Sequence, residues 1–310
     1  MIHLKNRALG SLIGLAVGDA IGTTLEFKKR DLADKVEDMI GGGPFELNPG
    51  EWTDDTSMAL CLADSLIEFN GFYPEDQMNK YYKWFSDGYN SSTGYCFDIG
   101  NTIKEALFNY KKTGMAYSGK ESAESAGNGS LMRLAPIPIF YFTTLENKKG
   151  LQLLVQYAEQ SSRTTHAEKS CLDACKIYAL MINKAFNGLP KKDILSFADE
   201  ELNESNVSSQ KIREIVKGSY KQKSRDDISS SGYVVHSLEA ALWAFYNTDS
   251  YKEGVLLAAN LANDADTVAA IYGQLAGAYY GLDGIPQEWV EKLAKKEKLF
   301  STSLNLLRVQ

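Results

Sequence analysis

Apolar residues recur at three- and four-residue intervals along nearly the whole chain, which is the spacing of amphipathic helices. No stretch alternates between apolar and polar residues over six or more positions, so the pattern requires no β-sheet. We therefore predict an all-α fold that forms one compact multi-helix domain over residues 1–310. The predicted helices cover 4–21, 56–69, 76–86, 99–112, 150–161, 167–187, 210–220, 234–247, 252–262, 267–280 and 286–298.

Glycine and asparagine residues mark the breaks between these segments, as at 41–43, 70–71, 127–129 and 187–188. No proline- or serine-rich linker separates two halves of the chain, which favours a single domain. The stretch 189–230 is the most polar part of the sequence. We predict surface helices and loops there.

The N-terminal segment superficially resembles a signal peptide, because basic residues precede a small apolar run. Asp19 interrupts that run, however, and glycines recur at positions 10, 14, 18 and 22. This spacing places the glycines on one face of a helix, so we predict a first helix packed inside the fold. The longest uninterrupted apolar stretch, 134–142, contains two prolines and is too short to span a bilayer, so we expect no membrane association.

The composition is that of a soluble globular protein, with 44% hydrophobic and 24% charged residues. The net charge of −7 argues against a nucleic-acid backbone as the main partner, and an anionic ligand would need local hydrogen-bond donors. Cys61, Cys96, Cys171 and Cys175 lack the spacing of a zinc site, which favours free thiols in a reduced cytoplasm. We expect a cytoplasmic monomer.

Two acidic clusters each stand immediately before a predicted helix: Thr53-Asp54-Asp55 and Asp264-Ala265-Asp266-Thr267. Each cluster alone has an ordinary explanation, because Thr and Asp cap helix starts and acidic residues suit the positive end of the helix dipole. Together they also provide carboxylate and hydroxyl oxygens, the ligands that Mg²⁺ and Mn²⁺ prefer. The chain has only three histidines, which makes a histidine-ligated zinc site improbable.

Three further motifs contain candidate ligand-binding residues. In 127–133 (GNGSLMR), two glycines flank an asparagine before a helix start, so backbone N–H groups could face a phosphate, although such a loop is often only a turn. In 97–102 (FDIGNT), the ordinary explanation is that Asp98 caps a helix. In 232–236 (GYVVH), Tyr233 could stack on a purine or fill the core.

The sequence blocks GLAVGDAIGTTLEF (14–27), WTDDTSMAL (52–60), FDIGNT (97–102), GNGSLMRLAPI (127–137), GYVVHSLEAALWAF (232–245) and NDADTVAAIYGQLAGA (263–278) resemble those of ADP-ribosylglycohydrolases. The likeness is to the bacterial branch that includes the dinitrogenase reductase-activating glycohydrolase. The blocks occur in the order of the family over nearly the whole chain. The resemblance implies an all-α fold with a centre of two Mg²⁺ or Mn²⁺ ions at the base of a cleft.

The resemblance also implies a role for individual residues. The metal ligands would be Thr53, Asp54, Asp55, Asp264, Asp266 and Thr267, with Asp266 as the expected bridge between the ions. The catalytic carboxylates would be Asp98, Glu26 and Asp55. The substrate contacts would be Asn101, Gly127, Asn128, Gly129, Ser130, Met132, His166 and Tyr233. For His166, the residues that follow depart from the family pattern, and a core or surface position is an equal alternative.

The activity implied is removal of ADP-ribose from a modified protein side chain, with arginine as the expected target. The two cations would hold the ribose diol and polarise the attacking water, and a carboxylate would assist departure of the leaving group. One alternative keeps the hydrolase but changes the conjugate to serine-linked ADP-ribose, O-acetyl-ADP-ribose or a modified nucleic-acid base. Another is a module that binds ADP-ribose without cleaving it.

Overall fold

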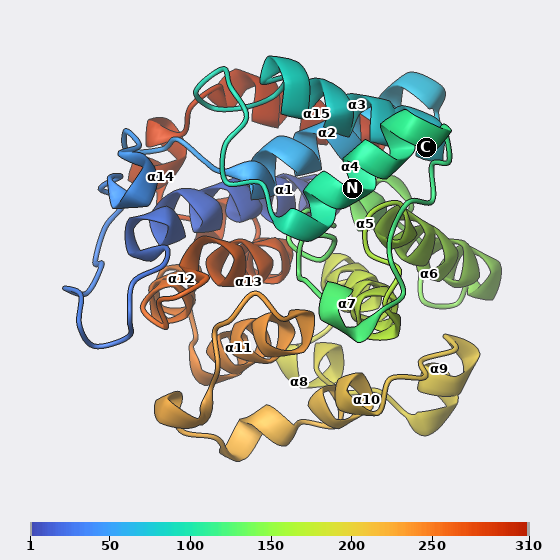
Figure 1. Ribbon diagram of the computed structural model, residues 1–310. Coiled ribbons are helices and arrows are strands. Elements are labelled where there is room, and N and C mark those ends of the chain that lie inside the picture. Colours follow the sequence, from blue (N-terminus) through green and yellow to red (C-terminus); the bar gives the residue numbers. More distant parts are fainter. Residues whose placement is uncertain (1, 309–310) are drawn as a thin grey trace.

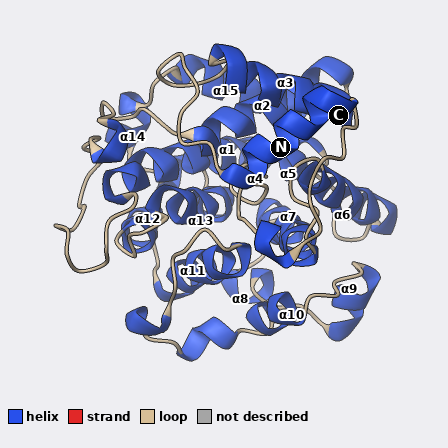
Figure 2. Ribbon diagram, viewed as in Figure 1, coloured by secondary structure: helices blue, strands red, loops and turns tan. Residues whose placement is uncertain are grey.

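A computed structural model describes residues 2–308, and Figure 2 shows helices and loops but no strand in that part of the chain. The predicted all-α fold is confirmed. The α-helices are α1 (Ile2–Gly22), α2 (Asp54–Phe69), α3 (Pro74–Asp87), α4 (Asn101–Thr113), α5 (Pro136–Phe140), α6 (Lys148–Arg163), α7 (Lys169–Phe186), α8 (Lys191–Ile194), α9 (Asp199–Glu204), α10 (Gln210–Val216), α11 (Val234–Asn247), α12 (Tyr251–Ala259), α13 (Ala265–Tyr280), α14 (Gln287–Lys292) and α15 (Lys296–Arg308). Short 3₁₀ turns occur at Thr23–Leu25, Gly43–Phe45, Ala123–Ser125, Ser219–Gln222, Arg225–Asp227 and Leu282–Gly284.

Helices α1 and α13 lie side by side at the centre of the molecule (Figure 1). Helices α2, α3, α4 and α15 lie above this pair in the view, whereas α11 lies below it and α12 lies to the left of α13. Helices α6 and α7 pack together on the right, and α8, α9 and α10 form the lower edge. The first and the thirteenth helix, far apart in sequence, therefore share the core.

The glycines of α1 allow this central pair to approach more closely than larger side chains would permit. A Cβ atom at Gly18 would lie 2.1 Å from the carbonyl oxygen of Ala269, and one at Gly22 would lie 2.3 Å from that of Ala265. Real Cβ atoms do not tolerate such distances. The predicted packed glycine face of the first helix is thus confirmed, and it brings the C-terminal end of α1 against the first turn of α13.

Helix α1 is also the segment whose length and hydropathy would suffice to cross a membrane, over Leu4–Leu25. That apolar window is 94% buried inside the protein. Burial of this kind is typical of a core helix, and here it is explained by the contact with α13.

One predicted element is wrong. The segment 286–298, expected as a single helix, is divided into α14 and α15 by a turn in which Lys295 adopts a left-handed backbone conformation (φ 45°). The turn lets Leu293 insert into the core while the N–H of Ala294 donates to the carbonyl oxygen of Gly50. Tertiary contacts with the loop before α2 therefore interrupt the helical pattern.

The polar stretch 189–230 consists of short helices and loops, as predicted. The four cysteines are free, with Cys61, Cys171 and Cys175 buried and Cys96 partly exposed, in agreement with the expectation of unpaired thiols.

Candidate active site

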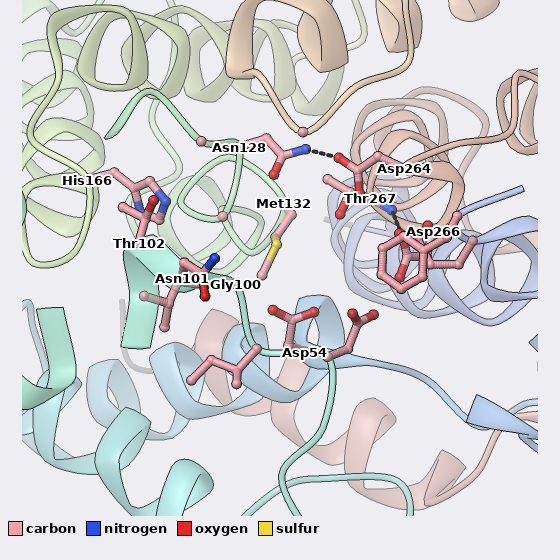
Figure 3. A pocket seen from close by; sticks show the side chains of 18 of the residues that line it. Asp54, Gly100, Asn101, Thr102, Asn128, Met132, His166, Asp264, Asp266 and Thr267 are labelled. Carbon is pink, nitrogen blue, oxygen red and sulfur yellow. Dashed lines mark hydrogen bonds between the residues drawn. The ribbon is translucent and has the colours of Figure 1, made fainter. Parts of the chain in front are cut away.

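A cleft of about 410 Å³ opens between the starts of α2, α4 and α13 and the loop before α5 (Figure 3). This volume lies within the range of small-molecule sites. The lining residues are Glu26, Phe27, Asp54, Asp98, Ile99, Gly100, Asn101, Thr102, Ile103, Gly127, Asn128, Gly129, Met132, His166, Gly232, Asn263, Asp264, Asp266 and Thr267. Within the described chain, this lining contains several carboxylates and neither lysine nor arginine.

The start of α2 is capped by a residue from another helix. Asp19 of α1 accepts hydrogen bonds from the backbone N–H groups of Thr53 (2.9 Å) and Thr56 (3.0 Å) and from both threonine hydroxyls (2.8 and 2.6 Å). Thr53, at the N-cap position, makes no side-chain capping bond. Capping by Thr53 is therefore wrong, although Asp54 and Asp55 do lie in the first turn of α2, where acidic residues suit the helix dipole. Their carboxylates are left available for other contacts.

The start of α13 is arranged in a similar way. Ala262 and Asn263 both have positive φ values (60° and 66°), a conformation that costs energy in non-glycine residues and occurs often at functional sites. The carboxylate of Glu26 accepts the N–H of Ala265 at 2.8 Å, whereas Asp264 at the N-cap position makes no side-chain capping bond. The oxygen Oδ2 of Asp264 instead accepts a hydrogen bond from Asn128 Nδ2, drawn in Figure 3.

The two acidic clusters converge, as the sequence predicts. One carboxylate oxygen each from Asp19, Asp55 and Asp266 lies within 4.8 Å of the others, and the same holds for Glu26, Asp264 and Asp266. The hydroxyl of Thr53 donates within the first group and lies 3.2 Å from Asp55 Oδ2 and 3.3 Å from Asp266 Oδ2. Asp266 thus belongs to both groups, and the α1–α13 contact positions them next to each other.

Burial and the charges of neighbouring acids raise the pKa values of Asp19, Glu26, Asp54, Asp55 and Asp264. The pKa of Asp19 is raised to about 7, chiefly by burial and then by the charge of Asp266. The pKa of Asp264 is also raised to about 7 by the same two causes. Burial and then Asp266 raise the pKa values of Glu26 and Asp54 well above the ordinary range, whereas burial and then Asp19 do so for Asp55. Without cations, the group is therefore an unfavourable concentration of negative charge.

This group of oxygens fits divalent cations. All its members are hard oxygen donors, which suit Mg²⁺ or Mn²⁺. Asp55 Oδ1 is buried and has no hydrogen-bond partner among the described residues. A buried carboxylate oxygen without a partner is costly, and a cation would satisfy it. The side chain of Thr267 is also buried at the cleft, next to Asp266.

Asp98 and Asn101 also line the cleft, just before and at the start of α4. Asp98 has a positive φ of 57° and is not a helix cap, because Gly100 occupies the N-cap position of α4. Burial and then the charges of Asp266 and Asp54 raise the pKa of Asp98 to about 11. Asn101 begins α4 and is exposed at the cleft. The N-terminal end of α4, with its unpaired N–H groups and positive dipole, therefore faces the ligand space.

The glycine loop forms the remaining wall. A Cβ atom at Gly129 would lie 2.8 Å from Ile103 Cδ1 and 2.9 Å from His166 Cε1, so a larger residue would fill the space between them. The imidazole of His166 is buried and lines the cleft, which places it at the predicted site. Met132 lines the same wall (Figure 3).

Two predicted substrate contacts lie outside the lining of the cleft. The hydroxyl of Ser130 is buried beneath the loop, where it accepts hydrogen bonds from Ser162 (2.8 Å) and Cys175 (3.5 Å). The ring of Tyr233 packs edge-on against His236 and lies below the ammonium group of Lys211. Tyr233 pairs through its backbone with Gly127, so it lies beside the loop, and the adjacent Gly232 reaches the cleft.

Sequence reasoning missed Asp19, Phe27, Thr102 and Asn263 as site residues. Asp19 could have been found, because it is the one acidic residue inside the long apolar segment 8–25. Phe27, which has a positive φ of 58° and a 65% exposed side chain, gives no comparable signal in the sequence.

Comparisons with known proteins show the class to which this all-α protein with its acidic cleft belongs. The sequence matches the family model described as ADP-ribosylglycohydrolase over residues 2–310. The chain therefore belongs to the ADP-ribosylglycohydrolase family and is an enzyme of that family.

Several relatives are similar over most of their length. A Pseudomonas putida (strain GB-1) protein described as ADP-ribosylarginine hydrolase Tri1 is 47% identical over 291 residues, which cover 93% of this chain and 74% of that protein. The ADP-ribosyl-[dinitrogen reductase] glycohydrolase of Rhodospirillum rubrum is 32% identical, with 94% and 92% coverage. A solved structure described as an ADP-ribosylglycohydrolase-related protein complex superimposes with a TM-score of 0.85 at 39% identity, covering 100% of this chain and 99% of that one.

Proposed function

We propose that this protein hydrolyses the N-glycosidic bond between ADP-ribose and an arginine side chain of a modified protein, with the help of two divalent cations. The observation that carries the proposal is that carboxylate oxygens converge in two groups. One group contains Asp19, Asp55 and Asp266, and the other contains Glu26, Asp264 and Asp266, so the two groups share Asp266. Membership in the ADP-ribosylglycohydrolase family supports the reaction type.

The residues that would hold the cations are Thr53, Asp54, Asp55, Asp264, Asp266 and Thr267, with Asp266 common to both ions. When bound, such cations supply Lewis-acid activation of water and an anchor for ribose hydroxyl groups. Asp19 and Glu26 hold this set in place, because they accept backbone N–H groups at the starts of α2 and α13.

Asp98 and Glu26 are the candidates for the general acid. Both line the cleft and both have pKa values raised by burial and by neighbouring carboxylates. Burial is the larger cause and also acts when cations cancel the repulsion, and a carboxyl group that keeps its proton can protonate a departing nitrogen or oxygen at the glycosidic bond. Turnover of Asp98→Asn and of Glu26→Gln on conjugates with different leaving groups assigns this role. The variant that lacks the general acid should lose most rate on the conjugate with the poorest leaving group.

The diphosphate would lie at the other end of the cleft. The start of α4 and the glycine loop 127–129 line that end. The N–H of Asn128 already donates to the carbonyl oxygen of Gly232, so the N-terminal end of α4 is the arrangement that favours an anion without a charged side chain. A ligand held there would place its distal ribose toward the acidic groups.

Arginine as the target is supported by two relatives, of Pseudomonas putida and Serratia proteamaculans, each described as ADP-ribosylarginine hydrolase Tri1, at 47% and 45% identity. The carboxyl oxygens of Glu26, Asp54 and Asp98 line the cleft and can also accept hydrogen bonds from a guanidinium group.

The experiment that tests this proposal measures free ADP-ribose released from an arginine-ADP-ribosylated protein by the metal-free enzyme before and after addition of Mg²⁺. We expect release only with Mg²⁺ and its loss on addition of a chelator. A serine-linked conjugate and O-acetyl-ADP-ribose serve as parallel substrates, and we expect each to be cleaved at least about tenfold more slowly.

The matched control is Asp34→Asn, which removes an exposed acid from the loop before α2 and should leave the rate unchanged. Cleavage of another conjugate but not the arginine one would overturn the choice of target. Tight binding of ADP-ribose without cleavage of any conjugate would overturn the enzymatic mechanism in favour of a binding module.

A further inference from the structure

Arg133, in the turn that follows the glycine loop, is fully buried yet has no carboxylate partner among the described residues. Its guanidinium group donates to Thr165 Oγ1 at 2.7 Å, lies 3.6 Å from Met58 Sδ and stacks over the ring of Tyr81 at 4.4 Å. Its Nε atom has no hydrogen-bond partner in the described part of the chain. Burying an unpaired charge is costly, so this arrangement needs a reason.

The hydrogen bonds around Thr165 have a defined direction. A guanidinium group can only donate, so the oxygen of Thr165 accepts from Arg133. The same oxygen lies 2.8 Å from Nδ1 of His166. The Thr165 oxygen has a second lone pair and can also accept from an Nδ1–H, but within residues 2–308 the Thr165 hydroxyl has no other acceptor for its own proton. Donation of that proton to Nδ1 is therefore the arrangement that leaves no buried hydroxyl proton unpaired, and Nδ1 is then the acceptor. In a neutral imidazole, the proton consequently lies on Nε2.

Nε2 of His166 faces the glycine loop that lines the cleft. Cβ atoms built at Gly127 and Gly129 would lie 3.3 and 3.2 Å from this nitrogen, so only the absence of side chains there leaves it accessible. His166 is itself only 1% exposed, and within residues 2–308 no protein group pairs with its Nε2. The imidazole is thus a buried polar group with one free donor position at the ligand space.

We propose that Arg133 and Thr165 are positioning residues that fix His166 as the neutral tautomer with the proton on Nε2. His166 then donates a hydrogen bond to the diphosphate of ADP-ribose. Through Thr165 and His166, the positive potential of Arg133 acts on that anion indirectly. This inference rests on the proposed function, since it takes the cleft to be the ADP-ribose site. It assigns to Arg133 the countercharge that the lining of the cleft does not provide, because neither lysine nor arginine is among the lining residues.

The electrostatics of the site agree with this assignment. Burial, and secondly the positive charge of Arg133, lower the pKa of His166 to about 3. The ring therefore stays neutral at physiological pH. A neutral histidine with a fixed tautomer is a directional donor, and its state does not change with the pH of the cell.

The test uses the full-length enzyme labelled with ¹⁵N-histidine, whose ring nitrogen shifts distinguish the two neutral tautomers. We expect the wild type to show His166 with a protonated Nε2, both free and with ADP-ribose. In Thr165→Val, we expect this pattern to be lost, and Thr165→Ser should restore it. His236, whose Nδ1 lies 2.8 Å from Ser231 Oγ, is an internal reference that should not change.

The second readout is the dissociation constant of ADP-ribose by calorimetry with Mg²⁺ present. Loss of one hydrogen bond supported by a charge should weaken binding by about 10- to 100-fold in Thr165→Val and in Arg133→Met, with recovery in Thr165→Ser. If Arg133→Met fails to fold, Thr165→Val still decides the matter, because it leaves the arginine in place.

A protonated Nδ1 in the wild type would overturn the proposal. It would also be overturned if Thr165→Val changes only one of the two readouts, or neither. Failure of the wild type to bind ADP-ribose would refute the proposed function instead, whereas the tautomer of the free enzyme would still decide whether Arg133 and Thr165 set the state of His166.

Discussion

At one end of the cleft, carboxylates from α1, α2 and α13 and from the residues next to α1 and α13 gather around Asp266, whereas at the other end the start of α4, the glycine loop and one neutral histidine form the walls. Burial acts on both ends but in opposite senses: it raises the pKa values of Asp19 and Asp264 to about 7 and lowers that of His166 to about 3. The acidic end therefore needs cations, and the neutral end can receive an anion. A ligand such as ADP-ribose, with a diol and a diphosphate, matches this division.

The two ends also differ in how they are built. The acidic end depends on helices α1 and α13, which are held together by glycines with no room for a side chain. The neutral end depends on loops and on the start of α4. Mutations at the acidic end should therefore affect stability and metal binding, whereas mutations at the neutral end should affect ligand affinity with little cost to the fold.

The largest effect is expected for Asp266→Asn, because this carboxylate belongs to both oxygen groups. We expect hydrolysis to fall by at least about 10³-fold, the scale of losing a central electrostatic group in an active site. In the absence of metal, the variant should be at least as stable as the wild type, because one source of repulsion is gone. Activity assays and thermal unfolding with and without Mn²⁺ test both parts, and a metal-free variant that unfolds well below the wild type would contradict the account.

Substitution of Gly18 by Ala tests the packing of α1 against α13 without replacing any carboxylate of the site. The new methyl group would lie 2.1 Å from the carbonyl oxygen of Ala269, so α1 and α13 must move apart. We expect a loss of about 2–3 kcal/mol in the free energy of unfolding, measured by urea denaturation. Gly100→Ala is the matched control, since no atom lies within 4 Å of its Cβ position and its φ is negative; equal losses in the two variants would count against a tight α1–α13 contact.

The pH dependence of the stability of the metal-free protein should reveal the raised pKa values of the buried carboxyl groups at the acidic end. An unfolded aspartate has a pKa of about 4, whereas Asp19 and Asp264 in the metal-free fold have pKa values of about 7. The folded state then binds more protons between these values, so its stability falls as pH rises from about 4 to 7. Asp98, whose pKa is raised to about 11, extends this trend to higher pH.

The lowered pKa of His166 has the opposite effect: below its ordinary pKa, the unfolded state binds the extra proton, so this contribution to stability rises with pH. It is, however, the contribution of a single group. We therefore expect metal-free protein to melt at a lower temperature at pH 8 than at pH 5, and Mn²⁺ to stabilise it more at pH 8. Greater stability of the metal-free protein at pH 8 would be inconsistent with the buried repulsion.

The smallest effect is expected at the neutral end, for Gly129→Ala. Its methyl group would press on Ile103 and His166 at 2.8 and 2.9 Å, both of which are side chains that can shift. We expect ADP-ribose affinity to fall by about tenfold while Mn²⁺ affinity and the unfolding temperature stay near those of the wild type. Calorimetry measures the affinity for ADP-ribose and the affinity for Mn²⁺. Equal losses of both affinities would contradict the distinction between the two ends of the cleft.

The sequence predicts the helices and the convergence of the two acidic clusters well, because both depend on local patterns and on a family resemblance. It does not predict that Asp19 caps α2, since that contact joins residues that only packing brings together. Nor does it predict the division of 286–298, where a buried leucine and the loop at Gly50 override helical periodicity. The positions of Ser130 and Tyr233 outside the lining of the cleft likewise depend on how the glycine loop packs against α7 and α11.

The most direct test of the central claim is a titration of metal-free protein with Mn²⁺, followed by electron paramagnetic resonance of the free ion. We expect two Mn²⁺ ions to bind per chain in the wild type and in Asp34→Asn, with binding of both ions weakened in Asp266→Asn because both groups share that carboxylate. Absence of binding in the wild type, or unchanged binding in Asp266→Asn, would contradict the account.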